Sequence, residues 1–297
     1  MMSEPAPVVV GVDGSVSGRD ALDWAVAEAA TRLRPLWIVH ACPPPIDPGP
    51  LGPVPSLSPY TGTSDVLQEA ARRARLVAPE VEVTARLVSG GPVPALLGQR
   101  ASLIVVGSRG RSGVRRALAG SVSVAVSARA QCPVVVVPPL REVVPGPSRA
   151  QVVVGVDGSY LSSRAIDFAL RAAAQRGVGL TALHAWIPRP PVDSGGLADD
   201  WAASRAAECR ALDGALAGRR GQFPTVAIKS KLACDDPAHA LAVESAGAAL
   251  VVVGSRGRGC MAGVLFGSVS QVLLHEAHCP IAVVRPRAAT AGPARAA

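Results

Sequence analysis

The chain repeats one sequence pattern, and this internal repeat constrains the fold more than any other feature. The segment VVVGVDGS begins at residue 8 and again at residue 152, which is an offset of 144 residues. Two later segments, VVGSRG from residue 105 and GSVS from residue 120, recur 147 residues further on. A solenoid repeat has a much shorter period. Because a domain takes about 100–200 residues, the repeat predicts that the 297 residues form two copies of one domain.

The repeat also sets the expected domain boundaries. We expect the first domain at residues 1–140 and the second at residues 151–288, joined by a linker rich in Pro and Gly at 141–150. Residues 289–297 are expected to form a flexible tail. The segment Pro43–Pro59 holds eight prolines in 17 residues and has no match in the second copy. It predicts a loop of polyproline character.

Each copy alternates short β-branched runs with longer amphipathic stretches. Val8–Val12 is a continuous apolar run, as expected for a strand that is buried on both faces. The first copy predicts strands at 8–12, 36–40, 81–88, 103–106 and 134–137, and helices at 17–33, 64–77 and 120–130. Such alternation predicts an α/β fold, in which helices cover a parallel sheet.

The offset changes from 144 to 147 residues just before the fourth predicted strand. There the first copy reads GGPVPALLGQRASL from residue 90, and the second reads DDPAHALAVESAGAAL from residue 235. The second version is about one helical turn longer. The first version contains Gly98, a poor helix former. We therefore expect a weak helix here in the first copy. In the second copy, a helix at 164–175 is expected to end at Gly177.

The composition indicates whether the chain can span a membrane or bind a nucleic acid. Hydrophobic residues make up 49% and the mean hydropathy is +0.31, but the uncharged run Cys260–Leu274 is shorter than the roughly 20 residues of a spanning helix. The N-terminus lacks a basic segment followed by an apolar one, so we expect a soluble cytoplasmic protein that binds no membrane. The net charge is +8, yet aromatics are only 3%. Since single-stranded nucleic acids need aromatic rings for stacking, we expect no nucleic-acid partner.

Cysteine and histidine spacing does not predict a metal site. The six Cys residues form no C-x-x-C pair, so we interpret them as reduced thiols that are mostly buried. His275 and His278 share a helix face but have no partnering ligand motif. His40 and His184 end equivalent predicted strands, and we expect them to be satisfied within the fold rather than to touch a ligand.

A glycine motif carries the chemistry. Both copies contain the spacing G-x2-G-x9-G-S directly after an apolar strand, at Gly107 in the first and Gly254 in the second. Glycines let a ligand approach the backbone, and a GS pair at a helix start offers free N–H groups and a positive dipole to phosphates. Asp13 and Asp157 follow the first strand of each copy, at the same edge of the sheet. They are placed to accept hydrogen bonds from a sugar or base. The plain alternative is that these glycines only make turns.

At these motifs the sequence resembles the universal stress protein family, in its tandem two-domain type. The resemblance covers nearly the whole chain, through VGVDGS, VHA or LHA, VVGSRG, GSVS and CP in each half. It implies two tandem Rossmann-like domains, each a five-stranded parallel sheet of order 3-2-1-4-5 with helices on both faces. It also implies ATP as ligand, with or without Mg²⁺. Such proteins usually form homodimers, often through the last strand, so the resemblance implies a homodimer or a tandem chain that mimics such a dimer internally. A regulatory protein partner is implied but not identified.

The resemblance assigns site residues in both copies. The first site would use Gly11, Val12, Asp13, Ala41, Gly107, Ser108, Arg109, Gly110, Arg111, Gly113, Gly120, Ser121, Val122 and Ser123. The second would use Gly155, Val156, Asp157, Ala185, Gly254, Ser255, Arg256, Gly257, Arg258, Gly267, Ser268, Val269 and Ser270. The arginines of the glycine loops either pair with phosphate oxygens or lie in a solvated loop.

Motifs of several nucleotide enzymes are missing from the sequence. It has no G-x-x-x-x-G-K-[ST] P-loop and no G-x-S-x-G elbow. The D-G-S segments also lack the leading Ser and Gly-Gly of the S-G-G-x-D-S loop of ATP pyrophosphatases. The resemblance implies an ATP-binding regulatory protein of the stress response, and the missing motifs lead us to expect at most slow incidental hydrolysis. Two alternatives stay open, a weak ATPase or nucleotidyl-transfer enzyme and a nucleotide-free dimer scaffold.

Overall fold

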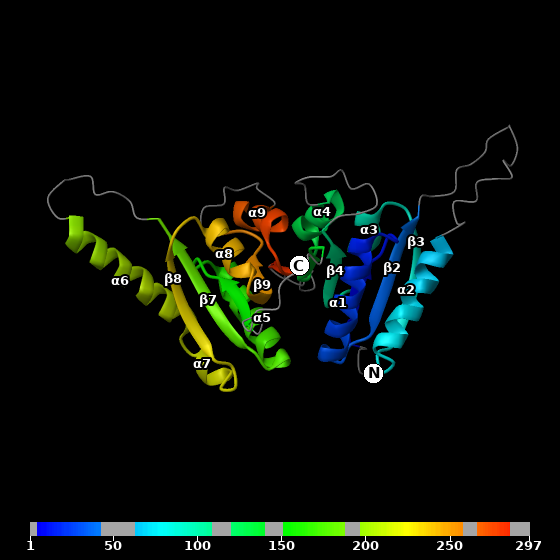
Figure 1. Cartoon of the computed structure of the whole chain (residues 1–297), viewed down its shortest axis with the longest axis horizontal. Helices are drawn as coiled ribbons and strands as arrows, with labels where there is room; N and C mark the ends of the chain where they lie inside the picture. The colour runs from blue at the N-terminus through cyan, green and yellow to red at the C-terminus, as the bar shows by residue number, and fades with distance from the viewer. Residues whose placement is uncertain are drawn as a thin grey trace, which may run out of the picture.

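The computed structural model describes residues 5–42, 63–108, 120–139, 151–187, 197–257 and 266–285. The predicted proline-rich loop, linker and tail lie outside these residues. Within them the strands form one sheet of order β3-β2-β1-β4-β5-β10-β9-β6-β7-β8. Figure 1 shows the two halves of the chain side by side, with α2 and α6 toward the outer ends.

The strands are β1 Val8–Gly11, β2 Leu36–Cys42, β3 Val83–Ser89, β4 Leu103–Gly107, β5 Val134–Val137, β6 Gln151–Gly155, β7 Gly179–Trp186, β8 Ile228–Cys234, β9 Ala248–Gly254 and β10 Ile281–Val284. The helices are α1 Val16–Arg32, α2 Thr63–Val77, α3 Pro92–Leu97, α4 Ser121–Arg129, α5 Tyr160–Arg176, α6 Leu197–Leu216, α7 Arg219–Gln222, α8 Pro237–Ser245 and α9 Ser268–Glu276. The elements predicted for the first copy agree with these bounds to within about two residues. The helix predicted at 164–175 begins earlier, at Tyr160.

Each half has the strand order expected for it, 3-2-1-4-5. In the first half β1 pairs in parallel with both β2 and β4, so that Val8 lies opposite Leu36 on one side and Leu103 on the other. In the second half β6 occupies the same central place between β7 and β9. Within each half all pairings are parallel, which confirms the α/β fold with a parallel sheet.

Two hydrophobic cores lie on opposite faces of the sheet, because successive strand residues point to opposite sides. Val8 and Val10 face the core formed with α1, α2, α5 and α6. Val9 faces the core formed with α3, α4, α8 and α9. Strands covered on both faces need apolar residues at every position. The valine runs in the sequence therefore reflect double coverage by helices.

The ends of the helices follow from a few local residues. Ser15 caps α1 by accepting a hydrogen bond from the backbone N–H of Gly18, and Ser159 caps α5 in the same way. Gly177 ends α5 in the left-handed conformation (φ 65°), as predicted. At the equivalent place α1 ends at Leu33, also left-handed (φ 51°). The helix α3 has six residues and α8 has nine, in agreement with the weak helix expected in the first copy.

The two halves meet along β5 and β10, which pair antiparallel. Ile281 lies opposite Val136, and Val283 lies opposite Val134. All residues of both strands are buried. The two expected five-stranded sheets are therefore one continuous sheet. The contact through the last strand, which the resemblance assigns to dimers, is made here between the two halves of one chain.

Candidate functional site

The second domain contains a cavity of about 360 Å³ at the carboxyl ends of β6 and β9. After β6 the chain continues to β7 on one side of β6, whereas β9 lies on the other side. The loops that follow β6 and β9 therefore diverge between these two strands. Ligands of open α/β sheets bind at this kind of switch point. The lining residues are Gly155, Val156, Asp157, Ser162, Leu183, Ala185, Pro237, Leu241, Val253, Gly254, Arg256, Gly257, Gly267, Ser268, Val269 and Ser270.

Most residues assigned to the second site line this cavity. Ser255 does not line it, and its side chain is fully buried. Its backbone shapes the site instead: the N–H of Ser255 donates to the carbonyl of Val284 (2.9 Å), and its carbonyl accepts from the N–H of Gly267 (2.8 Å). Arg258 lies outside the described residues.

Asp157 occupies one wall of the cavity. Its Oδ1 accepts a hydrogen bond from the backbone N–H of Ser159 at 2.9 Å, which fixes the carboxylate against the start of α5. A Cβ atom on Gly257 would lie only 2.7 Å from Oδ2 of Asp157. The second glycine of the motif therefore lets the glycine loop approach the carboxylate, besides leaving room for a ligand.

The start of α9 supplies backbone donors to the cavity. Gly267 caps this helix without a side-chain hydrogen bond, so no side chain of the cap covers the N–H groups of the first turn. Ser268 is exposed there, whereas Ser270 is buried and its Oγ donates to the carbonyl of Gly254 at 2.9 Å. Uncovered N–H groups and the positive end of the helix dipole favour an anion at this position.

Five lining residues are absent from the sequence-based assignment: Ser162, Leu183, Pro237, Leu241 and Val253. Leu183 could have been found, because it lies two residues before Ala185 on the same strand and so faces the same side. Pro237 and Leu241 belong to α8, and their place depends on how that helix packs. A Cβ on Gly155 would lie 3.0 Å from Leu241, which shows how closely α8 covers this strand.

The first domain repeats two of these contacts, although its Ser123, the equivalent of Ser270, donates to the carbonyl of Gly120 at 2.7 Å instead. Asp13 Oδ1 accepts from the N–H of Ser15 at 3.0 Å, and the N–H of Gly120 donates to the carbonyl of Ser108 at 2.6 Å. Gly11, Val12, Ala41, Ser121, Val122 and Ser123 occupy positions that match the second domain. Arg109, Gly110, Arg111 and Gly113 lie outside the described residues.

The first glycine of the motif has a packing function that the sequence interpretation missed. A Cβ on Gly107 would lie 2.6 Å from the backbone carbonyl oxygen of Ser17 in the first turn of α1. The equivalent Gly254 faces Leu161 of α5, whose Cβ would be 3.1 Å away. Ligand approach was the predicted reason for these glycines. At this first position the close contact is with a helix of the protein itself.

The two strand-end histidines bind backbone, as expected. His40 Nδ1 lies 2.6 Å from the carbonyl oxygen of Val12, and His184 Nδ1 lies 2.6 Å from that of Val156. His184 Nε2 is also 2.8 Å from Oε2 of Glu208 on α6. The rings therefore hold the loops that carry Asp13 and Asp157.

Two further properties concern the described residues alone. They contain no helix that is both long and apolar enough to cross a membrane. They also contain no group of three side chains suited to hold a metal ion.

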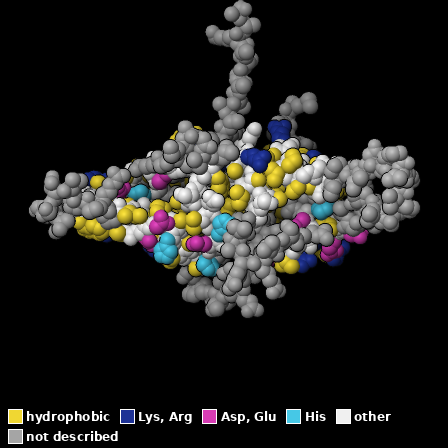
Figure 2. Space-filling model, turned by 90° about the horizontal axis from the view of Figure 1, so that it is seen from above, with side chains coloured by type: hydrophobic (Ala, Val, Ile, Leu, Met, Phe, Trp, Pro, Cys, Tyr) yellow, Lys and Arg dark blue, Asp and Glu magenta, His cyan; other side chains and the backbone are white. Residues whose placement is uncertain are grey.

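Figure 2 views the molecule from above, where hydrophobic side chains are interspersed with His, Asp and Glu, and Lys and Arg are scattered among the described residues.

Comparison with known proteins agrees with this architecture. The model of the universal stress protein family matches residues 6–138 and 149–285. Universal stress protein Rv2005c of Mycobacterium tuberculosis is 38% identical over 295 residues, which cover 96% of this chain and 99% of the relative. Rv2623 of the same organism is 37% identical over 288 residues, with 94% and 96% covered.

A solved structure supports the fold across both domains. The crystal structure of a universal stress protein from Archaeoglobus fulgidus superimposes with a TM-score of 0.64, at 20% identity, and covers 95% of this chain and 98% of that chain. Both halves match the family model and the relatives extend over nearly the full length. The chain therefore belongs to the universal stress protein family, as a tandem of two family domains.

Proposed function

We propose that the chain is a regulatory protein that binds an adenine nucleotide, primarily ATP, in each of its two domains. The observation that carries this proposal is the cavity at the switch point of β6 and β9, bounded by a helix start without a side-chain cap and by a fixed carboxylate. A cavity of about 360 Å³ is within the usual range for small-molecule sites.

The lining residues divide into an apolar part and a polar part. Val156, Leu183 and Leu241 offer a surface suited to a flat base. Arg256, Ser268 and the N–H groups at the start of α9 offer donors and positive charge suited to phosphates. The carboxylate of Asp157 can accept hydrogen bonds from ribose hydroxyls. This division matches the three chemical parts of a nucleotide.

Magnesium would accompany the phosphates rather than occupy a site of its own. Mg²⁺ is commonly bound through one or two carboxylates together with substrate phosphates. Asp157 is the carboxylate that lines the cavity. In the first domain Asp13 holds the equivalent place. Bound Mg²⁺ would neutralise phosphate charge.

A binding function is favoured over catalysis by the sequence. The chain has no P-loop and no nucleophile elbow. We propose that bound nucleotide biases the conformation of the protein or its choice of a protein partner in the cytoplasm. A weak ATPase would reveal itself by multiple turnovers with Mg-ATP that are lost when Asp13 and Asp157 are replaced.

Nucleotide identification tests the proposal directly. Protein purified without added nucleotide is denatured by heat, and the released ligand is identified by mass spectrometry, while calorimetry measures ATP binding to the emptied protein. We expect an adenine nucleotide and a stoichiometry of two. A native preparation without nucleotide, which also fails to bind ATP, would contradict the proposal.

A glycine variant tests the assigned site. Gly257→Glu places bulk and negative charge beside Asp157, since even its Cβ would lie 2.7 Å from Oδ2, so it should remove one of the two proposed ATP sites. Gly110→Glu together with Gly257→Glu should remove both. Gly247→Glu is the matched control, because a Cβ there meets nothing within 4 Å. Unchanged ATP affinity in the folded double variant, verified by circular dichroism, would overturn the site assignment.

A further inference from the structure

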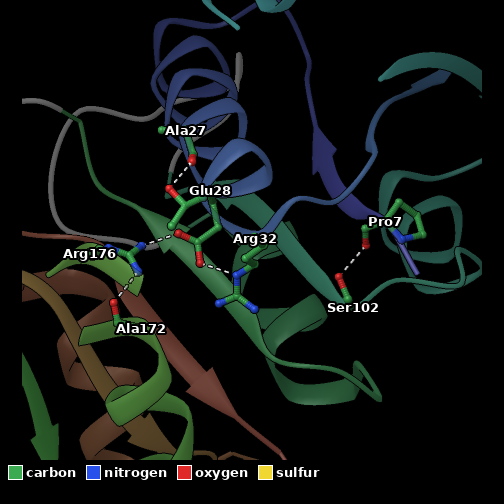
Figure 3. Close-up of polar contacts among 8 residues, drawn as sticks. Pro7, Ala27, Glu28, Arg32, Ser102, Ala172 and Arg176 are labelled. Carbon is green, nitrogen blue, oxygen red and sulfur yellow. Dashed lines mark hydrogen bonds and ion pairs between the residues drawn. The ribbon is translucent and has the colours of Figure 1, made fainter. Parts of the chain in front are cut away.

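One buried carboxylate connects the two domains. Glu28 of α1 is only 2% exposed, and its Oε1 accepts a hydrogen bond from Nε of Arg32 at 2.6 Å. Its Oε2 accepts from Arg176, which belongs to α5 of the second domain. Figure 3 shows both guanidinium groups pointing toward Glu28 from the two helices. The two arginine side chains are 18% and 19% exposed, so all three charges are largely removed from water.

The surroundings of Glu28 follow the internal repeat. Arg32 and Arg176 are equivalent residues of the two copies, and so are Trp24 and Phe168. The guanidinium of Arg32 lies 5.1 Å from the ring centre of Phe168, and that of Arg176 lies 5.7 Å from the ring centre of Trp24. Each arginine thus reaches across the boundary to the aromatic ring of the other domain. The contact is symmetric in these four residues.

The carboxylate breaks this symmetry. The residue equivalent to Glu28 in the second copy is Ala172, so the contact holds one carboxylate for two arginines. A second difference lies near the seam between β5 and β10. Arg285, which follows β10, donates to the carbonyl of Ala128 at the end of α4, and its equivalent in the first copy is Pro138, which has no side-chain donor. Each domain therefore supplies a polar group that the other lacks.

We propose that Glu28 makes this interface specific for unlike domains, so that the first domain pairs with the second domain and not with its own copy from another chain. Two second domains in the same contact would bring two copies of Arg176 together, with Ala172 in place of each carboxylate. A largely buried charge that lacks its partner is strongly destabilising. Two first domains would lack Arg285, which leaves the ends of both α4 helices without that donor.

The interface therefore favours closure within the chain. If two chains exchanged domains so that like domains paired, two contacts with one carboxylate each would be lost. One contact with two carboxylates and one contact with no carboxylate would replace them. The contact with none is the costly one. A second copy of this chain is thus a poor partner for the face formed by α1, β5, α5 and β10.

Relocating the charge tests the proposal in the full-length protein. Glu28→Ala removes the carboxylate, and adding Ala172→Glu restores one at the equivalent position of the other domain. Amide hydrogen exchange of β5 and β10 measures opening of the seam, with β2 and β7 as references for unfolding of each domain. Glu69→Ala is the matched control, because Glu69 also pairs with an arginine on its own helix but is exposed.

We expect exchange at β5 and β10 to rise at least about tenfold in Glu28→Ala and to recover in the double variant, since either domain can supply the one carboxylate. Exchange at β2 and β7 should stay unchanged. If Glu28→Ala does not fold, Glu28→Gln, which keeps the shape, replaces it. Unchanged exchange at the seam, or no recovery in the double variant, would overturn the proposal.

The specificity of domain pairing is measured by co-expressing copies of the chain that carry two different affinity tags and purifying them through one tag. Wild-type copies should not co-purify, copies of Glu28→Ala should, and copies of the double variant should again remain separate. Equal co-purification in all three cases would show that the buried carboxylate does not select unlike domains.

Discussion

At the scale of residues, the glycines of the repeated motif serve packing, in addition to the ligand approach that we propose for them. Gly107 lies against the backbone of α1, whereas Gly257 lies against the Asp157 carboxylate. The sequence reveals that a small residue is required at both positions, because the spacing occurs twice. It does not reveal what each glycine faces, since the first turn of α1 and the Asp157 side chain are brought there by tertiary packing.

Replacement of Gly107 tests the packing role. Gly107→Ala places a Cβ about 2.6 Å from the carbonyl oxygen of Ser17, and we expect it to lower the free energy of unfolding by about 1–3 kcal/mol. Denaturant unfolding measures the change. Gly247→Ala, at an open position, is the control and should remain close to wild type. A Gly107→Ala protein as stable as the control would show that α1 does not constrain this residue.

Cys132 gives a prediction that depends on pH. Burial raises the pKa of its thiol to about 11, so the reactive thiolate is scarce at pH 8 and forms only as the pH approaches that value. Cys234 is exposed. Alkylation by iodoacetamide, followed by peptide mass spectrometry, should modify Cys234 at pH 8 and leave Cys132 largely intact. Equal modification of both residues at pH 8 would contradict the raised pKa of Cys132.

At the scale of elements, the strands could be predicted well and the site only in part. Runs such as VVVV at 134–137 are apolar at every position, and a strand covered on both faces needs this composition. The loops at the strand ends were also expected, because they carry the repeated motifs. Leu241 and Pro237 were not expected at the site, since nothing in the sequence places α8 over Gly155. Pairing of β5 with β10 depends on residues nearly 150 positions apart, so its register could not be predicted either.

The equivalent helices α3 and α8 should differ in stability. The helix α3 has six residues and no side-chain cap, whereas α8 has nine and is capped by Asp236, whose carboxylate accepts from the N–H groups of Ala238 and His239. We expect amide exchange in α3 to be faster than in α8 by about fivefold, as a cap contributes about 1 kcal/mol. Mass spectrometry of the two peptides measures it. Slower exchange in α3 would mean that packing outweighs length and capping.

At the scale of the whole molecule, pairing of β5 and β10 leaves β3 and β8 as the outer strands of the sheet. Both carry basic residues, Arg86 on β3 and Lys229 and Lys231 on β8. Charged side chains on outer strands hinder edge-to-edge association. Arg86 also covers the ring of Trp37 at 3.3 Å, and Lys231 pairs with Glu244. Growth of the sheet by further copies is therefore opposed at both ends.

The closed seam also frees the two halves to diverge. In a dimer of identical chains every substitution appears in both sites, so neither can be altered alone. Here Ser162 lines the cavity of the second domain where the first copy has Gly18, and α8 is longer than α3. Each half can thus change its residues while the partner half is left untouched. Because both halves lie on one chain, natural selection can act on the two proposed sites independently.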